Sequence, residues 1–467
     1  MNECLARLLS TVIEWPKTTT LLALALAFTG AYLSRSLAVD VFPDIKVPRI
    51  TIQTEAGGLT AEEVEQRITV PVESAMNGLK DVTNVRSSSG GGLSFVWVDF
   101  DWSSDSDSAR FHVFERLGQI RESLPREAVP EIAPVVSVSG EIMMVALISE
   151  STNVTGLALR EVAEYSLRNR LLAIPGIAQV VAIGGNLPEL RIGYSPRRLA
   201  QYGLGVNDLS EAVAASRTWA SGGYLADVKG EELSVRQVAR ADTVEELSSI
   251  WVPNEAGTPI RLDSVANVTL AGAPRRGSAS FNGRNAVVLS VQKAPGGNTL
   301  ELTKKVEDAL DGFPLPPGVR IEKDAYRQSG FINLSISNGR GMVFGAVLIV
   351  VVVLGLTLMS ARALIVVLLT MPVSIGAGLL LFPALGLSIN IMTLGGLAVA
   401  VGDIVDSAII FTDIFRRRVR ENPKAEILSA ALEVAPGVSF SGLVITIVFL
   451  PLFFLGGIEG AFFKPLA

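Results

Sequence analysis

The chain has 467 residues, of which 49% are hydrophobic and 18% are charged, and its mean hydropathy is +0.42. This composition fits a protein that combines membrane spans with soluble domains better than it fits a soluble enzyme. The formal net charge of -6 argues against nucleic acid as the main partner, because a polyanion requires a basic surface. The single cysteine, Cys4, and the single histidine, His112, exclude an internal disulfide and any cysteine-cluster or multi-histidine metal site within the chain.

Five apolar stretches approach the length of about 20 residues that a helix needs to cross a bilayer. The first shows no evident cleavage site and is long enough to remain as an anchor, so we expect no cleavable signal peptide. The predicted membrane helices are residues 18–37, 338–359, 363–382, 388–415 and 434–456.

Basic residues beside the spans predict the orientation. Arg416–Arg418, Arg420 and Lys424 form the densest basic cluster next to any span, which places the segment 416–433 in the cytoplasm. Counting back through the spans places Arg362 and the N-terminal residues 1–17 in the cytoplasm as well. The long region between the first two spans then lies outside, and 457–467 would be the truncated start of a further segment.

The outer region has short alternating strands, Gly-Gly breaks and amphipathic helices, which indicate an α+β domain. It contains a short internal repeat, because Gly176 follows Glu161 at the same spacing as Gly78 follows Glu63. In each copy a helix leads through a glycine to a strand, and Thr60 with Glu63 fits a capping box for the first helix. We therefore predict two similar subdomains of the ferredoxin-like, split βαβ type.

An insertion is predicted between the two halves of the second subdomain. Residues around 228–232 have the composition of a hairpin turn, and an arm of this sort is expected to serve subunit association. The predicted divisions are subdomain 1 at 38–133, the first part of subdomain 2 at 134–183, the insertion at 184–273 and the second part of subdomain 2 at 274–335.

Two local patterns invite a metal interpretation. The acidic run Asp99–Asp107 lacks the glycine and the terminal glutamate of an EF-hand loop, so a helix N-cap is the better interpretation. His112 is expected to be a surface or core residue. Met143 and Met144 are adjacent on a predicted strand and would point to opposite faces, so both cannot line one site. The sequence leaves the metal ligands, if any, unknown, and it indicates no cofactor.

The most informative segment is an apolar helix that carries carboxylates. No charged residue occurs from Ala363 to Gly402, and Asp403, Asp406 and Asp413 then follow. Residues three and seven apart on a helix share one face, and an ionised carboxylate within a bilayer is costly. A pair of satisfied core aspartates is the plainer alternative. The favoured prediction is that these three residues bind protons or cations and drive transport.

Several short motifs occur in the order that is typical of one known family: Val41–Ile45, Glu63–Thr69, Pro71–Glu73, Pro175–Ile177, Leu190–Ile192, Pro295–Thr299, Gly386–Asn390 and Thr393–Asp406. Together they resemble the N-terminal half of a resistance–nodulation–division (RND) efflux permease, a family of the bacterial inner membrane. The strongest match is Gly386–Asn390 with Thr393–Asp406, and the resemblance covers essentially the whole chain.

The resemblance implies that Asp406 is the aspartate used for proton translocation and that Asp413 stands where glutamate is usual. Drug exporters of the family commonly carry a second aspartate directly after the first, where this chain has Ser407. Some heavy-metal exporters carry an acidic residue six positions earlier, where this chain has Ala400. Asp403 stands at a generally apolar position, and we expect it to replace the missing carboxylate.

The resemblance also implies a homotrimer, a periplasmic adaptor, an outer-membrane channel and a basic counter-ion from a second half of the permease. Because the chain ends where a sixth span should begin, we expect either a fragment or one half of a split pump, inactive alone. Export of heavy-metal cations is preferred. The alternatives are export of drugs or other organic compounds and an inactive half that acts as a scaffold. No nucleophile–base arrangement or phosphate-binding loop is evident, so a secondary transporter is expected and an enzyme is not.

Overall fold

The computed structural model describes residues 9–467 except 35–36, 38, 41–42, 44–47, 137–138, 151–153, 218–219, 227–231, 238–240, 255–256, 275–276, 359–360 and 419–422. Three sequence predictions lie partly outside the described residues. These are the motif at 41–45, the hairpin turn near 228–231 and Arg420 of the basic cluster. The side chains of Arg362 and Arg416–Arg418 are also outside the described set.

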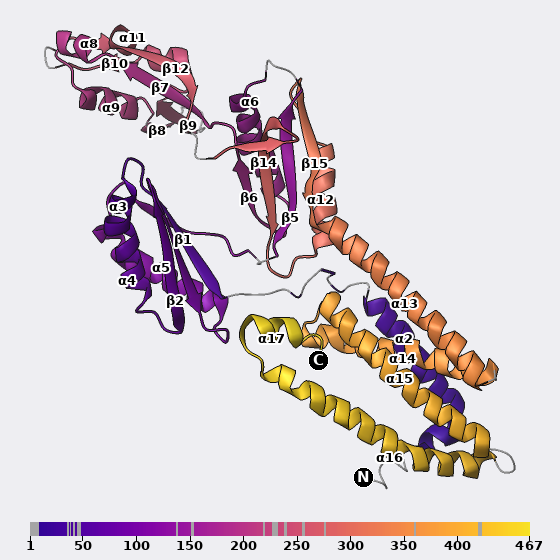
Figure 1. The fold of residues 1–467 in the computed structure, drawn as a ribbon. Helices are drawn as coiled ribbons and strands as arrows, with labels where there is room; N and C mark the ends of the chain where they lie inside the picture. The colour runs from indigo at the N-terminus through magenta and orange to yellow at the C-terminus, as the bar shows by residue number, and fades with distance from the viewer. Residues whose placement is uncertain are drawn as a thin grey trace.

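The first sheet unit, residues 49–132, is an antiparallel sheet of four strands with helices on one face (Figure 1). Its strand order is β2-β3-β1-β4. On β3, Val96, Val98 and Phe100 are buried while the residues between them are not, as a period of two requires. The elements are β1 (Arg49–Glu55), α3 (Ala61–Val64), η2 (Glu65–Thr69), α4 (Val70–Met76), β2 (Val82–Gly90), β3 (Leu93–Phe100), α5 (Ser106–Ile120) and β4 (Val129–Ile132).

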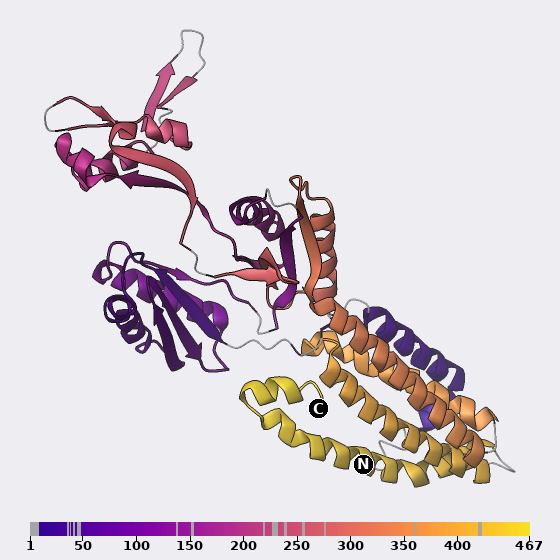
Figure 2. The same ribbon diagram turned by 45° about the horizontal axis from the view of Figure 1, so that its top comes forward.

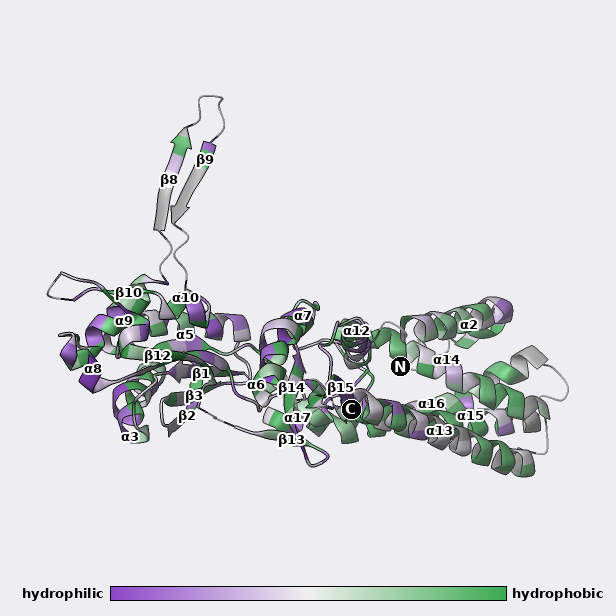
Figure 3. Ribbon diagram, turned by 90° about the horizontal axis from the view of Figure 1, so that it is seen from above, coloured by the Kyte–Doolittle hydropathy of each residue, from purple (hydrophilic) through white to green (hydrophobic). Residues whose placement is uncertain are grey.

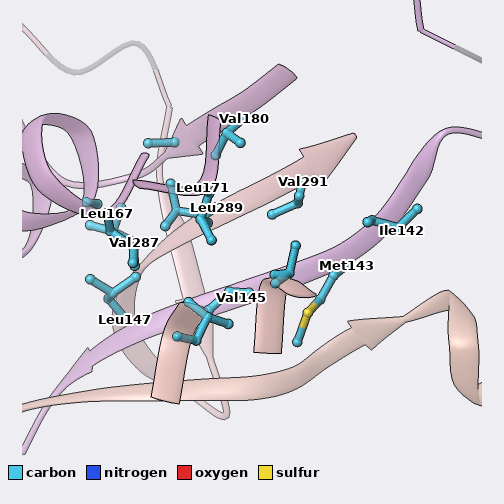
Figure 4. Close-up of a cluster of buried hydrophobic side chains, with 14 of the residues drawn as sticks. Ile142, Met143, Val145, Leu147, Leu167, Leu171, Val180, Val287, Leu289 and Val291 are labelled. Carbon is cyan, nitrogen blue, oxygen red and sulfur yellow. The ribbon is translucent and has the colours of Figure 1, made fainter. Parts of the chain in front are cut away.

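The second sheet unit consists of residues 141–183 and 279–327. Strand β5 lies between β14 and β15, while β6 and β13 both pair with β14. Figure 4 shows how side chains of β5, β6 and β14 meet Leu167 and Leu171 in one buried cluster. The elements are β5 (Glu141–Ser149), α6 (Gly156–Glu161), η4 (Val162–Leu167), α7 (Arg168–Leu172), β6 (Ile177–Ile183), β13 (Ala279–Phe281), β14 (Arg284–Lys293), α12 (Thr299–Asp311) and β15 (Val319–Arg327).

The two units share an unusual local feature in their first helices. A π-helical turn follows Glu63-Val64 as η2, and another begins at Val162 as η4. Such turns are rare, so their matched positions support the predicted internal repeat. The copies differ at the strand entrance, where Gly176 has φ of 99° but the corresponding left-handed residue of the first unit is Asp81, with φ of 63°.

Both predicted helix caps are confirmed. Thr60 and Glu63 form a capping box, and the pKa of Glu63 is lowered chiefly because the Thr60 backbone N–H donates to its carboxylate. Asp105 caps α5 by accepting hydrogen bonds from the Ser108 hydroxyl at 2.7 Å and from the Ser108 backbone N–H at 2.9 Å. These two bonds, in that order, lower the pKa of Asp105. The cap interpretation of the acidic run therefore replaces the metal interpretation at Asp105.

The insertion between β6 and β13 has a hydrophobic core of its own. Its long ladder joins β7 (Pro188–Tyr194) to β12 (Ala266–Gly272), and a hairpin of β8 (Ala220–Ala226) and β9 (Glu232–Gln237) projects from it (Figures 2 and 3). The predicted hairpin is thus confirmed by its strand pairing. The remaining elements are α8 (Pro196–Gln201), α9 (Val206–Ala215), α10 (Val244–Ser248), β10 (Trp251–Val252), β11 (Ile260–Arg261) and α11 (Leu262–Val265).

Long helices form the rest of the molecule, and hydrophobic residues recur along them (Figure 3). Among the described residues, three helical segments are long and apolar enough to cross a membrane: Leu364–Leu385, Ile391–Phe415 and Ile427–Phe454. The predicted spans in α2 and α13 remain predictions. The elements are α2 (Pro16–Leu33), α13 (Gln328–Leu358), α14 (Ala361–Leu385), α15 (Ile391–Arg418), α16 (Pro423–Phe449), η5 (Leu450–Phe454) and α17 (Gly457–Phe463).

Two of these helices extend beyond the predicted membrane spans at their N-terminal ends. Helix α13 starts at Gln328, directly after β15 ends at Arg327 and before the span predicted from 338. Helix α16 starts at Pro423, within the segment 416–433 that is predicted as a cytoplasmic loop or helix. In both cases a polar first segment precedes the apolar stretch, and hydropathy detects only the apolar part of a helix.

Helices α2 and α14 pack closely at two glycines. A Cβ atom on Gly30 would lie 2.1 Å from the carbonyl oxygen of Gly376, and a Cβ atom on Gly376 would lie 2.6 Å from the Cα atom of Ala27. Small residues let membrane helices approach backbone to backbone, which strengthens van der Waals packing where lipid offers no hydrophobic driving force. Gly30 and Gly376 therefore hold α2 against the bundle.

This contact predicts that Gly376→Ala lowers the free energy of unfolding by about 1–3 kcal/mol, because the added methyl group meets backbone atoms that cannot move aside. Gly378→Ala is the matched control, since a Cβ atom there meets nothing within 4 Å. The measurement is thermal unfolding of the detergent-solubilised protein. Equal effects of the two substitutions would contradict the packing argument.

Candidate functional site

Helix α15 begins at a buried cap. The side-chain oxygen of Asn390 accepts hydrogen bonds from the backbone N–H groups of Met392 and Thr393, at 2.9 and 3.0 Å. In return, the Thr393 hydroxyl accepts a hydrogen bond from the Asn390 backbone N–H at 2.9 Å. Asn390 and Thr393 are both 2% exposed. Each side chain satisfies a backbone group that the start of a helix leaves unpaired, so the axial position of α15 is well defined.

One face of α15 packs against α14. Val405 is buried against Val367 and Met371 of α14, and Val401, Ala408 and Ile409 extend the contact along the helix. Helix α15 also contacts α13 and α16. This apolar stripe fixes the rotation of α15 about its axis, and the rotation determines where the carboxylates lie.

The three predicted carboxylates lie away from that stripe. Asp406 follows Val405 by one residue, or about 100° around the helix, and its side chain is exposed. Asp403 and Asp413 are half-buried. Since residues three and seven apart share a face, the helix brings all three to the same side. Sequence reasoning places these residues correctly on one apolar helix, and the structure adds that α14 does not cover Asp406.

Two carboxylates on one helix face are suited to proton binding. An ionised carboxylate in an apolar helix bundle is unfavourable unless a proton, water or a counter-ion offsets its charge, and a second negative charge one turn away adds repulsion. The occupancy by protons then depends on what surrounds the face. A change of helix packing can thereby be linked to uptake or release of a proton.

The structure offers no cluster that would hold a resident metal. Within the described residues, no group of three or more His, Cys, Asp and Glu side chains could hold an ion. His112 is exposed on α5. Met143 is buried in the core of the second sheet unit (Figure 4), whereas Met144 is half-buried on the opposite face of β5. The prediction that these methionines cannot share one site is confirmed.

One buried charge pair was missed by the sequence reasoning. The ammonium group of Lys293 binds the carboxylate of Asp40 at 2.8 Å, although 253 positions separate the two residues. Such a pair exists only once the fold has formed. The one available signal was a lysine at the end of a largely apolar strand, two residues after Val291.

Comparison with known proteins identifies the family. Residues 8–467 match the AcrB/AcrD/AcrF family. The chain belongs to this family. The match confirms the RND resemblance derived from the motifs, and apolar helices combined with sheet-rich units fit a permease of this family.

Several curated relatives of this AcrB/AcrD/AcrF family member are named as cation-efflux or metal-resistance proteins. The chain is 32% identical over 462 residues to the cation efflux system protein CusA of Escherichia coli K12. It is 29% identical over 487 residues to the cobalt-zinc-cadmium resistance protein CzcA of Cupriavidus metallidurans, and 28% over 490 residues to the nickel and cobalt resistance protein CnrA of the same organism. These matches cover 95%, 99% and 95% of the chain but only 44%, 45% and 45% of the relatives. The chain therefore spans slightly less than half of their length.

The cap of α15 yields a prediction. Asn390→Ala removes the acceptor for two backbone N–H groups and is expected to cost about 0.5–2 kcal/mol. Amide hydrogens of Met392 and Thr393 should exchange faster by a corresponding factor, measured by hydrogen–deuterium exchange. Asn390→Ser keeps an uncharged side-chain oxygen that can accept hydrogen bonds at the helix start and serves as the control. Unchanged exchange in Asn390→Ala would show that the cap does not hold the helix start.

Proposed function

We propose that this chain is the N-terminal half of a proton-driven RND permease that exports heavy-metal cations across the bacterial cell envelope. The observation that carries the proposal is the carboxylate face of α15, with Asp406 exposed beside the stripe that packs on α14. Carboxylates within an apolar helix bundle are costly, so their presence there indicates a functional site. The metal-related names of the relatives support the class of cargo.

Asp406 is the main proton-binding residue, and Asp403 and Asp413 complete the relay. Protonation removes a charge from the helix face and permits closer packing, while deprotonation requires water or a counter-ion. We assign the counter-ion to a lysine or arginine of the second half of the permease. That half would cover the face that α14 leaves open.

The two sheet units act as the porter domain on the periplasmic side, with the N-terminus in the cytoplasm and the helices in the inner membrane. Their equivalent strand orders support two ferredoxin-like subdomains at 38–133 and at 134–183 with 274–335. The separate core of the insertion supports a docking subdomain at 184–273. We assign the remaining partners, an adaptor protein and an outer-membrane channel, from the family resemblance.

The first test substitutes the proposed proton site. In the complete permease, Asp406→Asn keeps the size of the side chain but removes its ability to exchange a proton, so metal resistance should fall to the level of a strain without the permease. Ser407→Ala, one residue away and uncharged before and after, is the matched control and should retain resistance. The measurement is growth on graded copper, silver, zinc, cobalt and dyes, with membrane levels of each variant checked.

The outcomes separate the candidate functions. Loss of metal resistance in Asp406→Asn alone supports proton-driven metal export. Loss of dye resistance with unchanged metal resistance would move the cargo to organic compounds. Full resistance of Asp406→Asn to every compound would favour a scaffold that transports nothing.

A second test addresses the role of Asp403. If Asp403 replaces the carboxylate that drug exporters carry at the position of Ser407, Asp403→Asn should reduce resistance and Asp403→Asn/Ser407→Asp should restore much of it. The double variant keeps the number of carboxylates and moves one of them along the same helix. Failure of the double variant, despite normal membrane levels, would show that Asp403 acts by its own position.

The hairpin supports the proposed homotrimer. Leu225 and Leu233 pair across β8 and β9, and they are 61% and 56% exposed. Two large apolar side chains on a projecting arm are typical of a surface that a second subunit covers. Leu225→Asp/Leu233→Asp should therefore shift the assembled permease from trimer to monomer in native mass spectrometry. An unchanged trimer would remove the arm from the interface.

A further inference from the structure

A buried ion pair lies between the helical part and the second sheet unit. The ammonium group of Lys293 donates to both carboxylate oxygens of Asp40, at 3.0 and 2.8 Å, and to the carbonyl oxygen of Gly297 at 2.9 Å. The hydroxyl of Thr299 donates to the same carboxylate at 2.5 Å. The side chains of Lys293 and Asp40 are 2% and 9% exposed. All three ammonium hydrogens thus have acceptors.

The start of a helix and the end of a strand surround the ion pair. Thr299 is the first residue of α12, so the Asp40 carboxylate lies at the positive end of that helix. Lys293 is the last residue of β14, and its backbone N–H donates to the carbonyl oxygen of Gly140 at 2.8 Å. Asp40 is therefore held by the strand end and the helix start of the second sheet unit together.

The backbone of Asp40 faces the opposite way, toward the helices. Its N–H donates to the carbonyl oxygen of Ile389 at 3.1 Å, and Val39 forms a parallel bridge with Ile389. The next residue, Asn390, is the cap of α15. One residue, Asp40, thus binds the porter-side sheet through its side chain and the start of the proton-relay helix through its backbone.

A second connection between the same parts is covalent. Strand β15 ends at Arg327 and α13 begins at Gln328 without a break, so the second sheet unit continues directly into a long helix (Figure 1). The connection through α13 reaches α15 only by helix–helix packing. The connection through Asp40 reaches Ile389, the residue directly before the Asn390 cap of α15.

From this geometry we infer that Asp40 and Lys293 form a coupling joint, which transmits movement of α15 to the second sheet unit when the carboxylate face changes its protonation. The inference rests on the proposed function for its biological meaning. Asp40 and Lys293 are positioning residues in this role, since they act through α12 and α15 and contact no cargo. A buried pair with four hydrogen bonds has a narrow range of geometries, so the two elements must move together.

The test is a double-mutant cycle across the joint in the complete permease that contains this chain. Asp406→Asn mimics the protonated site. Hydrogen–deuterium exchange then reports on the Leu300 and Glu301 amides, which donate to the Asn298 cap of α12. The cycle is repeated with Asp40→Leu/Lys293→Met, which removes both charges so that neither is left buried without its partner. No cargo is needed for this readout.

In the parent protein, we expect Asp406→Asn to change the exchange rate of these amides within the usual coupling range of about 5- to 150-fold. In the Asp40→Leu/Lys293→Met background, we expect Asp406→Asn to leave the exchange rate unchanged. Asp311→Asn/Lys323→Met is the matched control. It removes the ion pair between Asp311 and Lys323 in the same unit, in which Asp311 is 70% exposed, and should leave the response intact. An ion pair that is merely structural would change the baseline exchange but not the response to Asp406→Asn.

Two results would overturn the joint: an equal response in both backgrounds, or no response in the parent protein. Thr299→Val, which removes one donor from the Asp40 carboxylate and leaves the ion pair, keeps the test available if the double variant does not fold. It should weaken the response, and an unchanged response would also count against the joint. Metal resistance of Asp406→Asn is scored separately, so failure of the proposed transport is distinguishable from failure of the joint.

Discussion

An ionised carboxylate within an apolar helix bundle is the constraint on which this structure depends. The cost of such a charge is lowered by a proton, by water or by a counter-ion, and each remedy requires a different arrangement of the surrounding helices. Helix α15 carries Asp403, Asp406 and Asp413 on one side while Val405 packs on α14. The stripe that packs and the face that carries the carboxylates belong to the same helix, so a movement of one is a movement of the other.

The remainder of the helical part keeps that element in place. Gly30 and Gly376 bring α2 and α14 into backbone contact, and α14 in turn supports α15. Asn390 fixes the start of α15, while the neighbouring Ile389 is bonded to Asp40. The sheet units are built on separate hydrophobic cores and can respond as bodies rather than as flexible chains. A small movement of α15 would therefore displace the second sheet unit as a whole.

Much of this organisation could be predicted from the sequence, because apolar runs, caps and charge-bearing helices are local signals. The capping box at Thr60 and Glu63, the cap at Asp105 and the placement of Asp403, Asp406 and Asp413 on one helix all depend on residues close in the chain. The polar first segments of α13 and α16 extend these helices beyond the predicted spans, since hydropathy detects only the apolar part of a helix.

What the sequence could not reveal are contacts between distant segments. Lys293 and Asp40 pair only after β14, α12 and the segment following α2 have met. The closeness of Gly30 to Gly376 also depends on tertiary packing. At many other glycines of the chain an added Cβ atom would meet no atom within 4 Å, and the sequence does not distinguish the two kinds. Whether a glycine or a lysine is structurally decisive is a property of its neighbours in space.

We propose that movement of protons along the carboxylate face of α15 drives the export of metal cations. The most direct measurement reconstitutes the complete permease in liposomes that enclose a metal-sensitive dye and follows zinc or copper entry with and without an imposed pH gradient. We predict that cation flux appears only with the gradient and is accompanied by proton movement in the opposite direction. Equal cation flux without a gradient, or flux with no proton movement, would contradict it.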